Sequence, residues 1–275
     1  MYIRPTAPRT IGGVLDDAVR LYRASFSRCW VLALIGGALS GAFGVYATLH
    51  MGALGALRSA TGAAGFAAAL TRLQAVEHTP GLWVSDVLVT LTWLVVRAAL
   101  IARQNAIATG GDETLAAAVG FALRRLPSMI AAAFVWAVAL TVGLILLIVP
   151  AIWLWGQLQL WLVALVAEDI GPLEALRRSW TLVERNWWRA SVTVGVAVVI
   201  IWVLSLVGGA AAGVGLVFLR TDPGMALLAT QLITVVVGIF TMPMLTVVLV
   251  AMYHDLRLRR DGGDLAARVS TLQPA

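Results

Sequence analysis

Six long apolar segments dominate this sequence and limit what the chain can fold into. They cover about residues 26–49, 82–107, 127–149, 151–167, 190–219 and 225–252. About 20 apolar residues in a helix cross a bilayer. Only 12% of the 275 residues are charged, and the mean hydropathy is +0.90. The pattern predicts an all-α polytopic membrane protein with six transmembrane helices. It excludes a soluble enzyme, a disordered chain and, because Cys29 is the single cysteine, a disulfide scaffold.

The placement of arginine predicts the orientation. All 20 basic residues are arginines, and sixteen of them fall on the side that would hold both termini. Arg58, Arg72 and Arg220 fall on the other side, and Arg97 lies within a span. The excess of positive charge marks the cytoplasmic side. We therefore expect both termini to lie in the cytoplasm. Arginines beside apolar spans indicate anionic lipid as the partner and give no reason to expect nucleic acid.

A short amphipathic segment precedes each odd-numbered span. The clearest lies near 173–187, where Trp180 and Trp187 fall on an apolar face opposite Arg177 and Arg178. Such a helix lies in the headgroup plane, so these four residues are predicted at the membrane interface. The chain then reads as three pseudo-repeats of an interfacial helix and a transmembrane hairpin, within one membrane domain. The repeats cover about 9–108, with an external insert at 50–81, then 112–168 and 171–256, followed by a cytoplasmic tail at 257–275. The insert is either another interfacial helix or a loop.

Local signals predict several further details. Pro150 falls between the third and fourth spans, where we expect a tight hairpin with the proline at its turn. Two Gly-x-x-x-Gly motifs, at 37–41 and 209–213, favour helix packing inside the monomer over dimerisation. The pairs Glu168-Asp169 and His254-Asp255 stand at the ends of spans, where solvated interface charge is the expectation.

Polar side chains inside the spans are the candidate ligand-binding residues. In the second span Asp86, Thr90, Trp93, Arg97 and Gln104 form one stripe. Ionisable groups at this depth are expensive, so the stripe should face protein or a water-filled cleft. The fourth span adds Gln157 and Trp161, and the sixth adds Gln231 and a mid-span Pro243 that frees a backbone carbonyl. The ligand-binding candidates are Arg97, Gln157, Gln231, Asp86, Trp93 and Trp161. They could hold an anionic group such as a lipid phosphate, or could hydrogen-bond one another between helices.

Signatures of catalysis are missing from the sequence. It contains no H-E-x-x-H, G-x-S-x-G or Walker motif and no Cys/His cluster. We expect no catalytic residue, metal or cofactor. The leading hypothesis is a non-enzymatic integral membrane protein that binds or translocates a lipid or a small anionic molecule. The alternative is a membrane scaffold or accessory protein that recruits a membrane-protein partner, or senses the bilayer, through its amphipathic helices.

Three stretches of the chain resemble a bacterial membrane family. They are Ile148-Val-Pro-Ala-Ile-Trp, the run from Ala167 to Arg189 with its Glu174–Trp188 core, and the opening from Pro8 to Arg23. They are similar to the glycerophosphoryl diester phosphodiesterase membrane-domain family, which overlaps the YciC-like uncharacterised inner-membrane proteins. The resemblance implies a multi-pass protein of the bacterial inner membrane with the membrane region only, and it supplies no ligand site. A phosphodiesterase barrel needs about 250 residues of its own, so that activity is not expected here.

Two departures separate the chain from the family pattern. The proline often seen late in the fourth span is absent at Leu162-Val163-Ala164. Glu184-Arg185-Asn186 replaces the usual turn that contains glycine.

Overall fold

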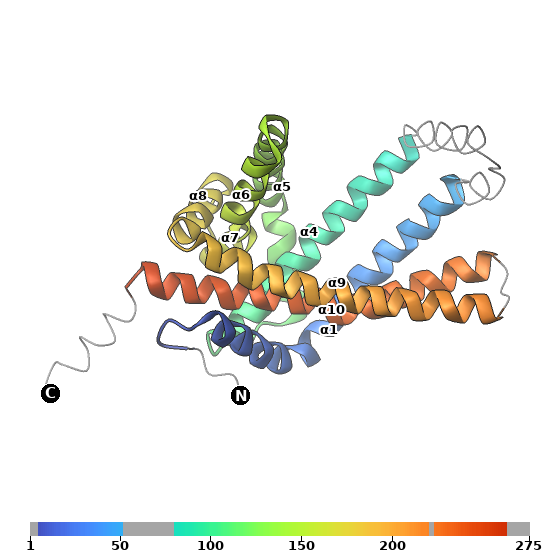
Figure 1. Ribbon diagram of the computed structural model, residues 1–275, viewed down its shortest axis with the longest axis horizontal. Helices are drawn as coiled ribbons and strands as arrows, with labels where there is room; N and C mark the ends of the chain where they lie inside the picture. Colours follow the sequence, from blue (N-terminus) through green and yellow to red (C-terminus); the bar gives the residue numbers. More distant parts are fainter. Residues whose placement is uncertain (1–4, 52–79, 220–222, 263–275) are drawn as a thin grey trace, which may run out of the picture. The chain divides into compact units, whose positions relative to one another are not determined.

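The computed structural model describes residues 5–51, 80–219 and 223–262, and every element in these ranges is an α-helix. Most of the predicted insert at 50–81, and the tail from residue 263, lie outside the described residues. Figure 1 shows the eight helices: α1 (Ile11–Met51), α4 (Pro80–Ala108), α5 (Leu115–Leu146), α6 (Ile148–Leu158), α7 (Trp161–Glu168), α8 (Pro172–Val183), α9 (Trp187–Leu219) and α10 (Pro223–Arg260). Within these described ranges, six stretches are long and apolar enough to cross a membrane. The predicted all-α polytopic fold is confirmed.

The chain divides into two compact units. Unit 1 comprises Met1–Ala33, Leu94–Val203 and Phe240–Ala275, and unit 2 comprises Leu34–Trp93 and Leu204–Ile239. The core of unit 1 is built from consecutive buried residues of α4 (98–101), α7 (161–166) and α10 (247–253). Burial all around a helix marks the interior of a bundle, because a helix at its surface would bury one face only.

The three amphipathic segments differ in the structure. The third is a separate helix, α8, which begins at Pro172 as its sequence predicts. The first and second continue without a break into α1 and α5. Each of the three apolar faces nevertheless has buried residues, among them Ala18 in α1, Ala122 in α5 and Leu176 in α8, although Leu173 at the start of α8 is exposed. The threefold repeat stays a prediction.

The third and fourth spans form a tight hairpin, but its turn is not at Pro150. Helix α5 ends at Leu146 and α6 begins at Ile148, so a single extended residue, Leu147, connects them. Pro150 is the third residue of α6. There it costs no helical hydrogen bond, because N–H groups of a first turn have no intrahelical acceptor. Gly143 lets the two arms approach, since a Cβ at this position would lie 3.1 Å from the Ala151 Cα.

Unit 2 packs α1 against α10 through the first glycine motif. A Cβ at Gly37 or Gly41 would lie 3.3 or 3.2 Å from a side-chain methyl of Val235. The absence of side chains therefore lets the two helices approach closely, which confirms helix packing within the monomer at this motif. In the second motif, a Cβ at Gly209 would meet no heavy atom within 4 Å among the described residues.

Candidate functional site

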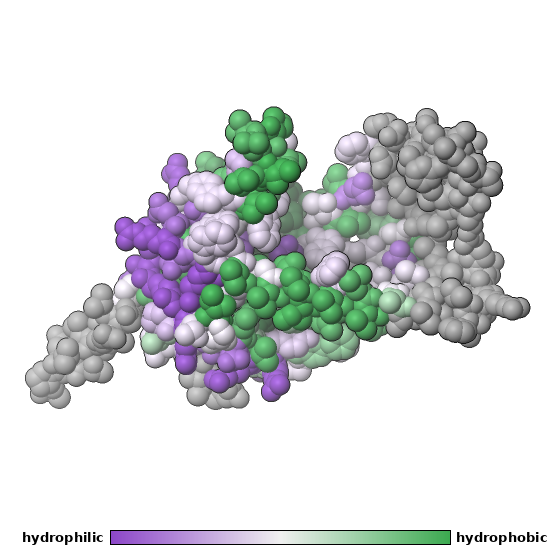
Figure 2. All heavy atoms as spheres, in the orientation of Figure 1, coloured by the Kyte–Doolittle hydropathy of each residue, from purple (hydrophilic) through white to green (hydrophobic). Residues whose placement is uncertain are grey.

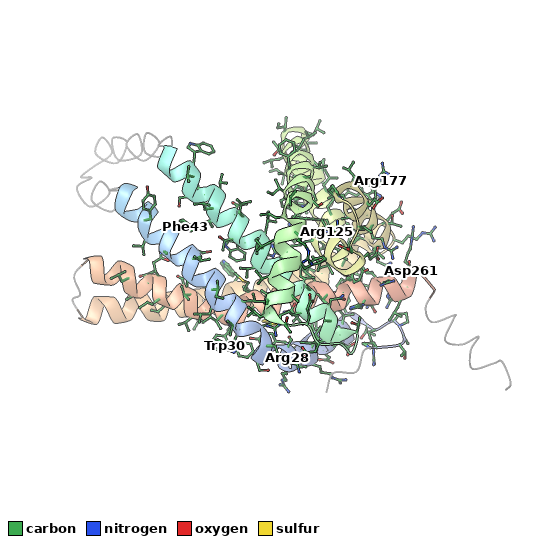
Figure 3. The ribbon with its side chains drawn as sticks, turned by 180° about the vertical axis from the view of Figure 1, so that it is seen from behind. Arg28, Trp30, Phe43, Arg125, Arg177 and Asp261 are labelled. Atoms are coloured by element: carbon green, nitrogen blue, oxygen red, sulfur yellow. The ribbon has the colours of Figure 1, made fainter. Side chains whose placement is uncertain are left out.

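Charged side chains of unit 1 gather at one end. Figure 2 shows hydrophilic residues around α8 and the end of α10, whereas the tip of the α5–α6 hairpin is hydrophobic. Arg125, Arg177 and Asp261 mark this end in Figure 3. We call it the arginine-rich end. Its members are five arginines, Arg9, Arg125, Arg178, Arg189 and Arg259, with the acidic residues Glu168, Asp169, Asp255 and Asp261.

Asp255 in α10 is the centre of this end and is only 5% exposed. Its Oδ1 accepts the backbone N–H of Arg9 at 2.7 Å. Its Oδ2 accepts Arg189 Nε at 3.1 Å and Arg259 Nε at 3.0 Å. Both guanidinium groups also donate to the Arg9 carbonyl oxygen. The segment before α1 is thereby bound to α9 and α10 through the backbone N–H and carbonyl groups of Arg9.

A second group of charges ties α8 to the ends of α7 and α10. Arg178 Nε donates to the Glu168 carboxylate at 2.8 Å, and its two terminal nitrogens donate to the two oxygens of Asp261. Tyr253 donates its hydroxyl proton to Glu168 at 2.6 Å. The hydrogen bond from Arg178 holds the pKa of Asp261 below its ordinary value. The same bond raises the pKa of Arg178, so this pair stays ionised.

Arg125 closes the same end from α5. Its Nε donates to the Asp169 carboxylate at 2.6 Å, and a terminal nitrogen donates to the Asp169 carbonyl at 2.7 Å. Asp169 ends α7 in the left-handed region, with φ 53°. Aspartate tolerates this conformation better than most residues. Arg125 therefore fixes a helix end through side chain and backbone together.

The prediction of solvated charge at the span ends is wrong for three residues of four. His254 and Asp255 are buried and Glu168 is half-buried, whereas Asp169 is exposed as predicted. The carboxylates of Glu168 and Asp255 can be buried because each accepts hydrogen bonds from two or more donors. One local signal was available: Asp255 and Arg259 stand four residues apart on one helix face.

The predicted membrane-interface residues split into two kinds. Arg177 is exposed, as the prediction requires, but Arg178 turns into the ion pairs described above. Trp180 and Trp187 are both half-buried against Trp153 of α6. The Trp180 ring meets that of Trp153 edge-on at 5.1 Å, and Trp187 Nε1 donates to the Trp153 carbonyl at 3.0 Å. Much of the predicted membrane face of α8 thus packs on protein.

Arg97, the first of the predicted ligand-binding residues, is half-buried in α4. Its guanidinium forms no hydrogen bond or ion pair with any residue that the structure describes. The arginines of the arginine-rich end all have partners, so Arg97 stands apart from them in environment.

Gln157 in α6 lies in the same unit and is 2% exposed, and its Oε1 has no hydrogen-bond donor within the described part of the chain. Two residues further on, both amide atoms of Gln159 are buried and equally without a partner there. Between α6 and α7 the fourth span is interrupted at Gln159 and Leu160. Ser179 of α8 fills this break, because its hydroxyl donates to the Gln157 carbonyl and accepts the Leu160 N–H. Neither Ser179 nor Gln159 was predicted from the sequence; a serine on the apolar face of α8 was the available signal.

The remaining candidates lie in different surroundings. Asp86 and Trp93 are exposed on the part of α4 that belongs to unit 2, and Trp161 is buried in the core of unit 1. Gln231, also in unit 2, lies against α1, where a Cβ at Gly44 would be 3.0 Å from its Nε2. A site that joins Gln231 to Arg97 and Gln157 stays a prediction.

Gln104, from the same stripe as Arg97, does act between helices. Its Nε2 donates to the Pro243 carbonyl at 3.0 Å, and Thr246 donates to the same oxygen. Tyr22 donates to the nearby Phe240 carbonyl at 3.1 Å. Neither carbonyl is the one that lacks a helical donor because of Pro243, since that is the carbonyl of Ile239, four residues earlier. These side chains therefore add hydrogen bonds that join α4 and α1 to α10.

Comparison with known proteins gives a match to a family, but none to an individual protein. No curated protein and no solved structure matches this chain. A family described as a domain of unknown function, DUF7847, matches residues 23–256, which include all six spans in whole or in large part. The chain therefore belongs to the DUF7847 family, whose function is unknown.

Proposed function

We propose that this protein binds, and in doing so holds or moves, an anionic lipid or a small anionic molecule, without catalysing a reaction. The observation on which the proposal depends is Arg97, a half-buried guanidinium in an apolar span without a partner among the described residues. Arginine presents a planar fork of donors that fits a phosphate or carboxylate. We assign the anionic group of the ligand to this fork.

The energetics support a ligand at Arg97. A charged residue near the centre of a membrane helix costs about 2.5–3.5 kcal/mol on insertion scales. An anionic group beside it recovers part of this cost, because attraction between opposite charges is strong where water is scarce. Gln157, whose Oε1 is buried without a donor in the described ranges, offers a neutral polar group in the same unit.

A scaffold function is the second candidate, and the exposed charges of α8 and of the turn after it favour it. Arg177 and Arg185 are both exposed. Such a surface suits an acidic partner or an anionic headgroup layer. Arg177→Glu should then reduce the amount of an acidic partner, or of anionic vesicles, that floats together with the protein. The same variant should leave ligand retention at Arg97 unchanged.

Lipid retention tests the primary proposal. The full chain, Arg97→Leu, Arg97→Lys and the matched control Arg124→Leu are purified in mild detergent, and the bound lipids are quantified by mass spectrometry. Arg124 is an exposed arginine of α5, so its loss removes the same charge from a solvated position. We expect Arg97→Leu to lose the anionic species several-fold, Arg97→Lys to keep part of it and Arg124→Leu to keep all of it. Equal retention in Arg97→Leu and the parent protein, with unchanged melting temperatures, contradicts the proposal.

A further inference from the structure

Unit 1 contains an apolar cavity of about 110 Å³ between three helices. Helix α1 contributes Leu15, Ala18, Val19 and Tyr22, helix α9 contributes Ala197 and Ile200, and α10 contributes Met244 and Val248. We call it the α1–α9–α10 slot. Every lining side chain is aliphatic or aromatic, apart from the hydroxyl of Tyr22. Val19 is 46% exposed, so the slot is open along this side of α1.

Both ends of the slot are held by specific contacts. Towards the arginine-rich end, Asp255 binds Arg9 and Arg189 and so joins the segment before α1 to α9 and α10. At the other end Tyr22 donates to the Phe240 carbonyl, and the Phe26 ring stacks on the Phe240 ring at 5.4 Å and 11°. The walls are therefore fixed to one another above and below the cavity, which keeps it from closing by a simple approach of the helices.

The open side of the slot is flanked by positive charge. Arg23 stands four residues after Val19 in α1, so the two side chains lie on the same side of the helix. Arg23 is exposed, and its guanidinium has no hydrogen bond or ion pair to the described residues. Asp17 is engaged by Arg9 at 3.7 Å, and Asp16 is seven residues, about 10 Å along the helix, from Arg23. The nearest uncompensated charge at the rim is thus a cation.

We propose that the α1–α9–α10 slot holds part of one acyl chain of a phosphate-bearing anionic membrane lipid, with the phosphate at Arg23. The chain's six apolar helices place the protein in a bilayer, where hydrocarbon is the surrounding solvent. A dry apolar cavity favours a hydrocarbon chain over water, because water there would have no hydrogen-bonding partner. Arg23 adds selectivity for an anionic headgroup. This site is separate from Arg97 and goes beyond the proposed function, because the lipid here fixes helices and is not cargo.

Photocrosslinking tests the site directly. The full-length protein is placed in phosphatidylcholine nanodiscs that contain phosphatidylglycerol with a diazirine in the middle of one acyl chain. After irradiation, adducts are mapped by peptide mass spectrometry and are normalised to those on α5, whose apolar Phe134 is 69% exposed. We expect enriched adducts on Ile200 and Met244. Equal yields on the slot and on α5 overturn the proposal.

Variants that fill the slot sharpen the test. Val19→Trp fills it from α1, Ile200→Trp fills it from α9, and each should lower the slot adducts several-fold. Val135→Trp in α5 is the matched control, since Val135 is 38% exposed and does not line the slot. Both filling variants replace partly exposed residues, and a melting curve for each shows that it folds. Unchanged slot adducts in a folded filling variant contradict the proposal.

The headgroup assignment has its own control. Arg23→Ala should lower slot adducts from the phosphatidylglycerol probe more than those from a diazirine phosphatidylcholine, whose choline offsets the charge of its phosphate, whereas Arg124→Ala should change neither. Equal adducts from both probes in the parent protein remove Arg23 from the proposal. Arg97→Leu should leave slot adducts unchanged, so failure at Arg97 and failure at the slot give different results.

Discussion

The arginine-rich end of unit 1 and the apolar span that contains Arg97 place the same residue type in opposite circumstances. At the arginine-rich end, Arg189 and Arg259 share the buried carboxylate of Asp255 and also bind a backbone carbonyl. In α4, Arg97 is half-buried without any such partner among the described residues. The difference teaches that arginines in this protein occur in two environments: those with partners join helices, whereas Arg97 contributes no such contact among the described residues.

Removing the centre of the paired region should have the largest effect. Asp255→Ala takes the acceptor away from two guanidinium groups and from the Arg9 N–H at once. Breaking a buried pair by removal of one partner typically costs about 3–5 kcal/mol. We expect a large fall in the melting temperature in detergent, together with faster proteolysis of the segment before α1.

Asp112→Ala is the matched control for Asp255→Ala. Asp112 is also paired, to Arg28 at 2.7 Å, but its side chain is 66% exposed. An exposed pair contributes about 0–1 kcal/mol. If the two alanine variants melt alike, the arginine-rich end is not held by its buried carboxylate, and its contrast with the Arg97 span fails.

A direct comparison of two arginines should have the next largest effect. Arg189→Leu removes a charged donor from Asp255 and should cost about 1.5–3 kcal/mol, the usual contribution of a hydrogen bond to a charged group. Arg97→Leu removes an unpaired charge from an apolar helix and should leave the melting temperature of delipidated protein unchanged or higher. Thermal unfolding of both variants in one detergent is the measurement. A fall in Arg97→Leu as large as that in Arg189→Leu would show that Arg97 is a structural residue.

The long apolar spans could be predicted from the sequence because length and hydropathy act locally. The contacts that shape the site could not. Asp255 binds a residue 246 positions away, and its neighbour Tyr253 reaches Glu168 across 85 positions. No local pattern encodes such pairings. The prediction of solvated charge at the span ends is therefore wrong for Glu168 and Asp255.

The predicted position of the α5–α6 turn is wrong for a different reason. The turn of the α5–α6 hairpin was placed at Pro150 because proline disfavours a helical residue before it. Proline is also well tolerated in the first turn of a helix, and that preference decided the position, with Leu147 as the connecting residue. Gln104 was predicted correctly as a polar residue facing protein, although its acceptor, the Pro243 carbonyl, could not be named from the stripe alone.

The break in the fourth span gives a smaller test of how polar groups are satisfied. Ser179→Ala removes the hydroxyl that serves the Gln157 carbonyl and the Leu160 N–H. A buried backbone group left without a partner costs about 1–3 kcal/mol. We expect a moderate fall in melting temperature and faster hydrogen exchange at Leu160. Thr181→Ala, which removes a half-buried hydroxyl bonded to the Arg177 carbonyl in its own helix, should change little. Equal effects would show that Ser179 does not stabilise the break.

The smallest expected effect concerns pH at the outer edge of the arginine-rich end. Arg178 holds the pKa of Asp261 below its ordinary value, so folding favours the ionised carboxylate. The resulting stabilisation is complete above the unfolded pKa of about 3.9 and is lost as the pH falls through the lower folded pKa. Because Asp261 is 37% exposed, the contribution should stay below about 1 kcal/mol. The fall in melting temperature between neutral pH and pH 3 should therefore be slightly smaller in Asp261→Asn than in the parent protein. An unchanged pH dependence in Asp261→Asn would mean that this pair contributes nothing, and that only the buried carboxylates, Asp255 first among them, fix the helices at this end.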